Sequence, residues 1–222
     1  MRKLKITIIL MLAVMLTGCS YVKSFGDRVV GSGVIKNEKR SVNAFTSIDA
    51  SGAFDVEVVC QKEQSLELEG DDNLLPLVKT EVRGSTLYIK PDKEFSVRKA
   101  IRVKIAVPNL ESISSSGASS FRVADVKNEK LKIDTSGASS LNLAGETKSL
   151  SLDMSGASKV ESEGLRAERV TISLSGAGKA SVYASEELNA EVSGAGSVSY
   201  AGDPKTVNKH VSGVGSVSKK SS

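Results

Sequence analysis

A three-residue motif, Ser-Gly-Ala or a close variant, recurs along this chain and limits the folds that the chain can adopt. From Gly117 onward, the glycines of the motif are 20, 19, 20, 18 and 19 residues apart. A period this regular indicates one structural unit that is stacked repeatedly on itself. The copies are Ser51-Gly52-Ala53, Ser116-Gly117-Ala118, Ser136-Gly137-Ala138, Ser155-Gly156-Ala157, Ser175-Gly176-Ala177, Ser193-Gly194-Ala195 and Ser212-Gly213-Val214.

Apolar and polar residues alternate on both sides of each motif. Apolar residues tend to recur five, three and one positions before its serine, and five and seven positions after it. This alternation indicates strands with one buried face. A unit of about 19 residues cannot bury that face alone, but stacked units form one continuous core. We therefore predict an all-β fold, a parallel β-helix (solenoid). The unit around Ser175 shows the whole pattern: Val170, Ile172, Leu174, Ala180 and Val182.

The glycine of each motif lies between the two alternating segments. If one strand ran straight through the motif, the glycine would face a very narrow interior. Because strands average only about five or six residues, a bend at the glycine is preferred. We interpret Ser-Gly-Ala as a packing device at this bend, with a ligand-binding face of serine hydroxyls as the alternative.

The chain begins like a bacterial secretory signal. Three basic residues precede the apolar run Ile6–Met15, which is too short to span a bilayer. The following Leu16-Thr17-Gly18-Cys19 resembles the lipobox of bacterial lipoproteins. This resemblance implies cleavage before Cys19, a diacylglyceryl group on Cys19 and acylation of the new N-terminus. Because Ser20 is not the Asp that retains some lipoproteins at the inner membrane, the outer membrane is favoured.

The rest of the chain is predicted to form one domain. Residues 1–18 are the signal peptide, residues 19–33 a tether and residues 34–222 a single solenoid domain. Within that domain, residues 60–108 lack the motif and are expected to form the irregular, capping part, whereas residues 109–222 form the regular coils. The capping part contains a helix-like segment at residues 72–79, with Asp72 and Asn73 as its expected start.

Composition excludes several classes of function. Cleavage removes Arg2, Lys3 and Lys5 and takes the formal charge from +4 to +1, so no nucleic-acid partner is expected. Without Cys19, only Cys60 remains, which excludes an internal disulfide and a cysteine metal cluster. The single histidine, His210, is assigned to the surface or to the last coil. We expect no catalytic, metal-binding or cofactor-binding residue.

Two further sets of residues deserve a structural interpretation rather than a chemical one. Asp71-Asp72-Asn73 lacks the ligand spacing of a calcium loop, and helix-start chemistry explains it better. Lys159 and Lys179 occupy the same position in adjacent coils and must be solvated. No cluster of acidic and basic groups is evident at equivalent positions of the repeat, as a β-helix lyase or hydrolase would require.

These pieces together resemble the head-GIN domain family of bacterial envelope proteins, which are described as autotransporter-adhesin-like. The resemblance covers nearly the whole mature chain and implies a β-helix-like, right-handed fold and an envelope location. It transfers no catalytic residue. The matching segments, beside the Ser-Gly-Ala motifs, are Phe45-Thr46-Ser47-Ile48, Asp55-Val56-Glu57-Val58, Asp71-Asp72-Asn73-Leu74-Leu75, Ser85-Thr86-Leu87-Tyr88-Ile89, Val107-Pro108-Asn109-Leu110-Glu111-Ser112-Ile113, Gly202-Asp203-Pro204 and Val211-Ser212-Gly213-Val214-Gly215.

Three functional hypotheses follow. The first is a lipid-anchored, non-enzymatic envelope protein whose solenoid is an interaction or adhesion-like module, with a glycan or protein ligand. The second is a protein that binds or processes polysaccharide, with its site where residues 60–110 meet the repeats. The third is a periplasmic partner in envelope-stress signalling. The fold alone does not choose among them.

Overall fold

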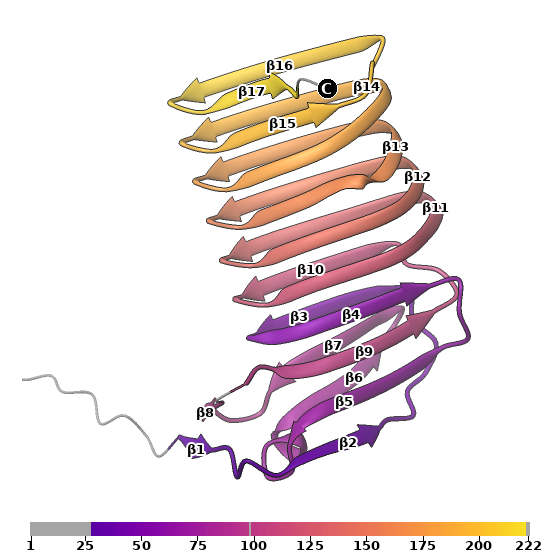
Figure 1. The fold of residues 1–222 in the computed structure, drawn as a ribbon, viewed down its shortest axis with the longest axis vertical. Coiled ribbons are helices and arrows are strands. Elements are labelled where there is room, and N and C mark those ends of the chain that lie inside the picture. Colours follow the sequence, from indigo (N-terminus) through magenta and orange to yellow (C-terminus); the bar gives the residue numbers. More distant parts are fainter. Residues whose placement is uncertain (1–27, 98, 221–222) are drawn as a thin grey trace, which may run out of the picture.

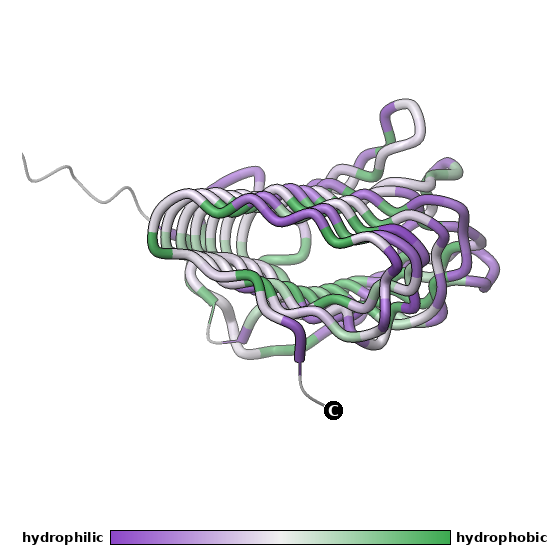
Figure 2. Tube along the Cα trace, turned by 90° about the horizontal axis from the view of Figure 1, so that it is seen from above, coloured by the Kyte–Doolittle hydropathy of each residue, from purple (hydrophilic) through white to green (hydrophobic). Residues whose placement is uncertain are grey.

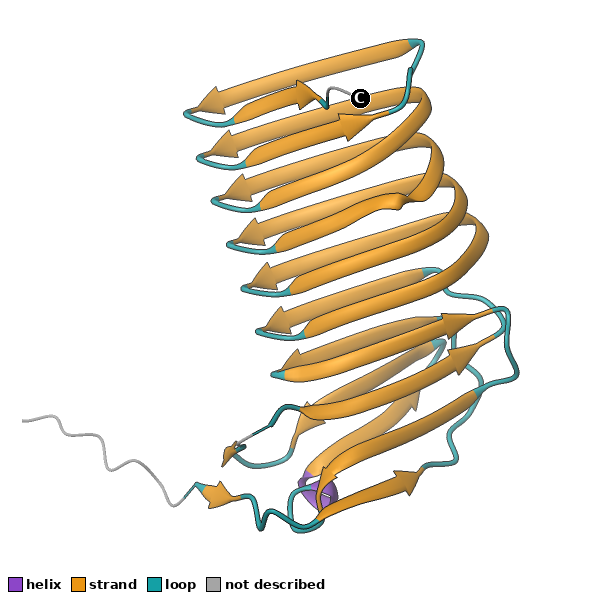
Figure 3. Ribbon diagram, viewed as in Figure 1, coloured by secondary structure: helices purple, strands orange, loops and turns teal. Residues whose placement is uncertain are grey.

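The computed structural model describes residues 28–97 and 99–220. The predicted signal peptide and Cys19 lie outside these residues. Most of the described chain is β-strand, and the strands form a tall stack of flattened coils (Figures 1 and 3). The predicted all-β, parallel solenoid is therefore confirmed. No helix in the described part of the chain is long and apolar enough to cross a membrane.

Each coil contributes to two walls, which lie on opposite sides of the core. The charged wall leads away from each Ser-Gly-Ala motif, and the serine wall leads up to the next one. The charged wall contains, in spatial order, β2 (Ile35–Lys39), β5 (Ser65–Asp71), β9 (Ile101–Val107), β4 (Phe54–Cys60), the first parts of β11 (Ser120–Gly137), β12 (Ser140–Gly156), β13 (Lys159–Gly176) and β14 (Lys179–Gly194), then β15 (Ser197–Ala201) and β17 (Ser216–Lys219). The serine wall contains β6 (Val78–Arg83), β7 (Thr86–Pro91), β3 (Ser47–Gly52), β10 (Ser112–Gly117), the second parts of β11 to β14, and β16 (Thr206–Gly213).

The register places equivalent residues of successive coils directly above one another. In the serine wall, Leu131 pairs with Leu150, which pairs with Val170, which pairs with Leu188. All four side chains are buried, as are the equivalent residues on the charged wall. Viewed along the stack, the coils superimpose around a common interior (Figure 2). The apolar columns predicted from the alternation therefore form the core.

The glycine of each motif makes the sharp corner between the walls. Gly176, for example, has φ +118°, which an L-residue rarely adopts, and the strand ends there. The predicted bend is confirmed. A Cβ atom on Gly176 would lie 2.5 Å from the carbonyl oxygen of Gly156 in the preceding coil. The following amide donates into the same stack, since Ala177 N bonds to Gly156 O at 2.9 Å. Glycine is thus required for both conformation and close stacking.

Residues 61–108 close the lower end of the stack (Figure 1). Here pairing is partly antiparallel: β5 runs antiparallel to β9 and to β2, and β6 runs antiparallel to β7. The first rung, β3 with β4, stacks directly below β10 and β11, so the early copy of the motif joins the regular ladder. A short 3-10 helix, η2 (Leu75–Leu77), lies in this region. The short strand β1 (Val29–Val30) pairs with β8 (Phe95–Ser96).

Candidate functional site

The outer surface of the serine wall carries a column of hydroxyls. The serine of each motif is exposed from Ser116 onward, and the column runs through every coil to Ser212. Two positions before it, the outward residues include Asp49, Asp134 and Asp153, which border a shallow hollow of about 460 Å³. Burial raises the pKa of Asp49. This face is flat, polar and small-featured, so it offers hydrogen bonds without enclosing a ligand.

The charged wall near the lower end carries a network of ion pairs. Arg122 donates hydrogen bonds to Glu57 at 2.9 Å and to Asp55 at 2.8 Å, and these bonds raise its pKa. On the strands below β4, Lys104 of β9 contacts Glu69 of β5 at 2.8 Å. Because these charges satisfy one another within the wall, few of them are available to a partner. Exposed pairs of this kind also contribute little to stability individually.

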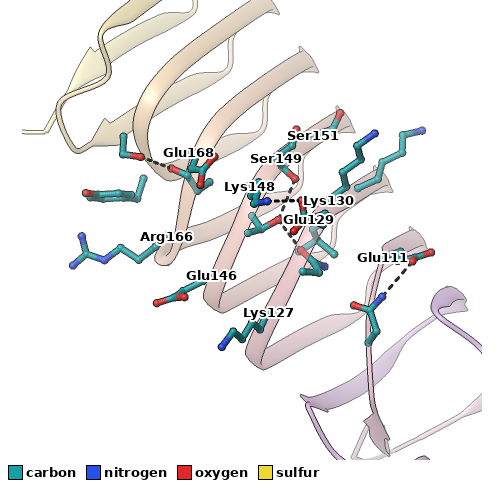
Figure 4. Close-up of a pocket in the computed structure, with 18 residues that line it drawn as sticks. Glu111, Lys127, Glu129, Lys130, Glu146, Lys148, Ser149, Ser151, Arg166 and Glu168 are labelled. Carbon is teal, nitrogen blue, oxygen red and sulfur yellow. Dashed lines mark hydrogen bonds and ion pairs between the residues drawn. The ribbon is translucent and has the colours of Figure 1, made fainter.

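The third side of each coil, which joins the charged wall to the serine wall, carries the larger hollow. This groove has a volume of about 1150 Å³ and extends from Asn109 and Glu111, just after the capping part, along the stack to Ser185 (Figure 4). It crosses several coils, so a ligand in it would contact equivalent positions of the repeat.

Charges of opposite sign alternate along the groove. Lys127, Glu146 and Arg166 occupy one column in successive coils, because their strands pair in register. A second column contains Glu129 and Lys148, which form an ion pair at 2.8 Å (Figure 4). The hydrogen bond from Lys148 to Glu129 raises the pKa of Lys148. The alternation keeps the groove close to neutral overall, which suits a ligand without large net charge better than a polyanion.

One aromatic ring lies at the upper end of the groove. The guanidinium carbon of Arg166 lies 4.4 Å from the centroid of the Tyr183 ring, a cation–π contact. Figure 4 shows Arg166 extended outward from its coil. This pair presents a planar surface together with hydrogen-bond donors. Binding sites for sugar rings and for planar amides combine these two features.

The buried Thr147 and the half-buried Asn128 hold the groove wall in place. The Asn128 side chain donates to the carbonyl of Leu110, in the segment that enters the first regular coil. Thr147, one coil higher, donates to Asn128 Oδ1 at 2.6 Å and contacts the carbonyl of Ser149 at 3.3 Å. Side chains from successive coils are thus bonded to one another and to the backbone. The groove therefore has a preformed shape.

The alternating charges correct one sequence-based expectation. No cluster of acidic and basic groups was expected at equivalent positions of the repeat, yet the register aligns Lys127, Glu146 and Arg166. They were missed because counting forward from the preceding motif places them at unequal distances, since β-bulges lie between Val123 and Val126 and between Asn142 and Gly145. Counting back from the following motif aligns them, because each lies nine positions before its serine. A signal that could have found them is the run of charged residues eight to thirteen positions after each motif.

A second correction concerns Asp71, Asp72 and Asn73. These residues hold the N-terminal segment against the lower end of the stack. Gly33 N donates to Asp71 Oδ1 at 2.6 Å, and Ser32 N donates to Asn73 Oδ1 at 2.9 Å. Ser32 Oγ donates to Asp72 Oδ1 at 2.6 Å, which lowers the pKa of Asp72. The described part of the predicted tether, residues 28–33, is thus bound to the domain.

The helix-start interpretation of these acidic residues was therefore wrong. The 3-10 helix begins after Leu74, and no side chain caps it. Pro76 lies at its start, where the missing amide costs nothing. The side chains of Asp71 and Asp72 point away from the 3-10 helix and accept hydrogen bonds from Gly33 and Ser32. These partners are distant in the sequence, so no local pattern indicates the contact.

The other predicted residues lie apart from the groove. Cys19 is outside the described residues, so its lipidation stays a prediction. His210 lies exposed on β16, in register with Glu191. Lys159 and Lys179 pair in register and are exposed, and Lys159 contacts Glu161 at 2.6 Å. Within residues 28–97 and 99–220, no group of three or more His, Cys, Asp or Glu side chains is placed to hold a metal ion.

Comparison with known proteins identifies the family. The family described as "Putative auto-transporter adhesin, head GIN domain" matches residues 44–204. The chain belongs to the head GIN domain family. The match covers the first rung, the capping part and all of the coils that form the groove. No curated protein matches the chain.

Solved structures share the head GIN fold of this chain. A protein from Bacteroides fragilis NCTC 9343, described as a putative adhesin, aligns with TM-score 0.71 and 23% identity over 86% of this chain and 100% of its own. A putative adhesin from Parabacteroides merdae ATCC 43184 aligns with TM-score 0.56 and 20% identity, over 88% of this chain and 100% of its own. A putative lipid binding protein from Parabacteroides distasonis ATCC 8503 aligns with TM-score 0.54 and 20% identity, over 87% and 100%. At these identities the likeness establishes the fold.

Proposed function

We propose that this protein is a lipid-anchored cell-envelope protein whose solenoid is a non-enzymatic, adhesion-like interaction module. The observation that carries the proposal is the preformed groove, which presents the same side of successive coils to a ligand. The head GIN family and the adhesin descriptions of two similar structures support it. The groove's carboxylates are spread along the stack, and Glu129 is paired with Lys148. This arrangement favours recognition over acid–base catalysis, which requires a positioned pair of groups.

Protease shaving of intact cells tests the adhesion-like role, with lysed cells as the control. Digestion of the solenoid in intact cells would place it on the cell surface, as the proposal expects. Protection until lysis would place it in the periplasm and contradict the adhesion-like role. A periplasmic location would instead favour a partner within the envelope, such as a stress-sensing protein.

Membrane attachment through Cys19 has its own test. Replacement Cys19→Ser removes the thiol that would carry the diacylglyceryl group, so the protein should move from the membrane fraction to the soluble fraction. Cys60→Ser is the matched control, because its thiol is buried in the domain and should not affect partition. Unchanged membrane partition of Cys19→Ser would contradict the lipoprotein assignment. If Cys19→Ser does release the protein, separation of the inner and outer membranes of wild-type cells tests the favoured outer-membrane location.

A second candidate is a polysaccharide-binding protein, favoured by one observation. The groove begins at Asn109 and Glu111, just after the capping part, and it contains the Arg166–Tyr183 pair near its other end. Such a pair can stack on a sugar ring while the neighbouring polar residues donate hydrogen bonds. A glycan array probed with the wild type and with Tyr183→Ala tests this candidate.

The glycan test needs a control on a different face. Lys179→Ala changes an exposed residue of the charged wall and should leave glycan binding unchanged. Loss of binding only in Tyr183→Ala would support the glycan site, and equal binding by both variants would reject it. Release of new reducing ends from a bound polysaccharide would contradict the non-enzymatic assignment.

A further inference from the structure

Large apolar side chains are exposed only at the two ends of the described stack. At the upper end they are Val207, Val211 and Val214, and at the lower end Val30, Val34 and Ile35. Across the intervening coils, the large apolar side chains of the described chain are buried or partly buried. The two ends therefore differ from the walls and from the groove, and each exposed set requires its own explanation.

At the upper end, the exposure follows from the position of the last coil. Val207 and Val211 pair with Leu188 and Val192, so they continue the interior columns and are exposed because no coil lies above them. The lower end is different. Ile35 pairs with Asp71 rather than with an apolar column residue, and Val30 and Val34 lie in the segment that crosses below the stack. These three residues, here called the apolar strip, lie within six positions of one another, and the fold itself does not require them to be exposed.

The strip is held firmly on the domain. β1 pairs with β8, and Gly31 N donates to Ser96 O at 3.2 Å. Asp71 and Asn73 bind the amides of the next two residues, as described above. Their exposed fractions are 62% for Val30, 55% for Val34 and 53% for Ile35. A fixed apolar strip of this kind is typical of a contact surface.

The path of the chain identifies what lies against it. Cys19, the proposed lipid attachment, is nine residues before Arg28, so the two residues are at most roughly 30 Å apart. The charged wall rises through nine strands from β5 to β17, roughly 40 Å at the usual strand spacing. A lipid on Cys19 therefore keeps the lower end of the stack within about 30 Å of the bilayer.

The charges around the strip are compatible with a membrane surface. Lys36 and Lys39 follow Ile35 on the edge strand β2, and both are exposed. The neighbouring acidic groups are paired, Asp72 with Lys36 at 3.7 Å, Glu94 with Arg28 at 3.2 Å and Glu38 with Arg40 at 2.9 Å, so these pairs add no net charge beside Lys39. Basic residues beside an apolar strip favour a surface of anionic lipid head groups.

We propose that Val30, Val34 and Ile35, with Lys36 and Lys39, form a membrane-contacting base on which the solenoid stands upright. This proposal rests on the lipid anchor proposed for Cys19, and it adds that the domain itself touches the bilayer. The upright orientation points the last coil away from the membrane and leaves the groove open along its length. A ligand can then reach the groove without competing with the lipid surface.

Site-specific fluorescence on the full, lipidated protein tests the base. The protein is reconstituted in vesicles of phosphatidylethanolamine and phosphatidylglycerol, and an environment-sensitive dye is attached at Val34→Cys. The matched control carries the dye at Val214→Cys, an exposed valine at the opposite end. The buried Cys60 should not label, and the lipid occupies Cys19. The dye at position 34 should be blue-shifted and quenched by nitroxide-labelled lipid, whereas the dye at position 214 should not.

A second variant separates contact by the base from mere closeness of the anchor. Val30→Ser with Ile35→Ser, in the Val34→Cys background, should lose most of the lipid quenching while the vesicles still carry the protein in a flotation gradient. Unchanged quenching in this variant, or no quenching at position 34 in a protein that floats, would overturn the base. Energy transfer between dyes at position 34 without lipid quenching would assign the strip to a second copy instead. If the protein does not float with the vesicles, the proposed lipid anchor on Cys19 is contradicted, and so is the upright orientation that depends on it.

Discussion

Each corner glycine combines an unusual backbone conformation with contact to the coil below. The positive φ excludes most side chains, and the stacked neighbour leaves no room for a Cβ atom. At Gly176, the added atom would lie 2.5 Å from Gly156 O and 3.0 Å from Gly156 N, both in the backbone. A backbone contact of this kind cannot be relieved by moving a side chain, so the pairing of the coils would have to open.

Gly176→Ala should therefore lower the free energy of unfolding by at least about 3 kcal/mol, from backbone strain together with the overlap. Gly84→Ala is the matched control, because Gly84 also has positive φ, at +60°, but nothing lies within 4 Å of its added Cβ atom. The control should cost only about 1 to 2 kcal/mol. Urea unfolding measures both, and equal losses would show that stacking contributes nothing beyond conformation.

Cys60 provides a test of burial at a single group. Burial, reinforced by the Asp125 carboxylate, raises the pKa of the Cys60 thiol from 9.0 to about 11. A raised folded-state pKa favours the neutral thiol, so its contribution to stability is complete below pH 9 and is lost as the pH rises towards 11. Relative to Cys60→Ser, the wild type should become less stable across that interval. The urea midpoints of the two proteins, measured between about pH 8 and pH 11, test this prediction. A difference between the midpoints that does not change with pH would contradict it.

At the scale of elements, the last coil shows how an open solenoid end avoids self-association. Its strands β16 and β17 leave unpaired backbone groups, which is a hazard for edge-to-edge pairing. Two lysines occupy interior columns there, because Lys209 pairs with Ala190 and Lys219 with Tyr200. Lys209 Nζ lies 4.8 Å from the Tyr200 ring centroid, and Lys219 contacts Asp203 at 2.5 Å. A further coil stacked on this end would bury both charges, at a high desolvation cost.

Replacing both lysines, as Lys209→Leu with Lys219→Val, should convert the end into a continuous apolar surface and shift the protein to larger species than the wild type. Light scattering coupled to size-exclusion chromatography measures the shift. Lys159→Leu with Lys179→Val is the matched control, since it makes the same changes on an outer face of the middle coils. Equal association of the two double variants would show that general hydrophobicity, rather than the open end, drives the effect.

At the scale of the whole molecule, each coil contacts only its neighbours, so stability should be nearly additive along the stack. Deleting residues 157–176 joins Gly156 to Ala177 and removes one coil without changing a corner. The shortened protein should still fold and unfold cooperatively, with a smaller urea dependence because less surface is exposed on unfolding. Circular dichroism during urea unfolding measures both properties.

Deleting only residues 157–166 is the control for this prediction. It removes half a coil, so the apolar columns and the glycine corners no longer coincide between neighbours. This variant should lose its cooperative transition. If both deletions behaved alike, register between coils could not be the main source of stability.

Much of the solenoid could be read from the sequence because its determinants are local and repeated. Apolar alternation around Leu150 and Leu152 specifies which side chains face inward, and the recurring glycine specifies where each coil bends. The same pattern in every coil also specifies the register, since a shift by one residue would expose every apolar column. The Ser51-Gly52-Ala53 copy could be assigned to the ladder on these grounds alone.

The groove and the N-terminal attachment were decided only by the tertiary structure. Lys127, Glu146 and Arg166 are equally spaced from the motif that follows each of them, but only the folded coils show that this column lines a groove beside Asn109 and Glu111. Asp71 and Asn73 bind backbone amides of Ser32 and Gly33 about forty residues away, a contact that no local pattern specifies. The sequence alone therefore determined the repeated core, because its signals recur within one coil. Irregular pairings and long-range hydrogen bonds determined the surfaces on which function depends.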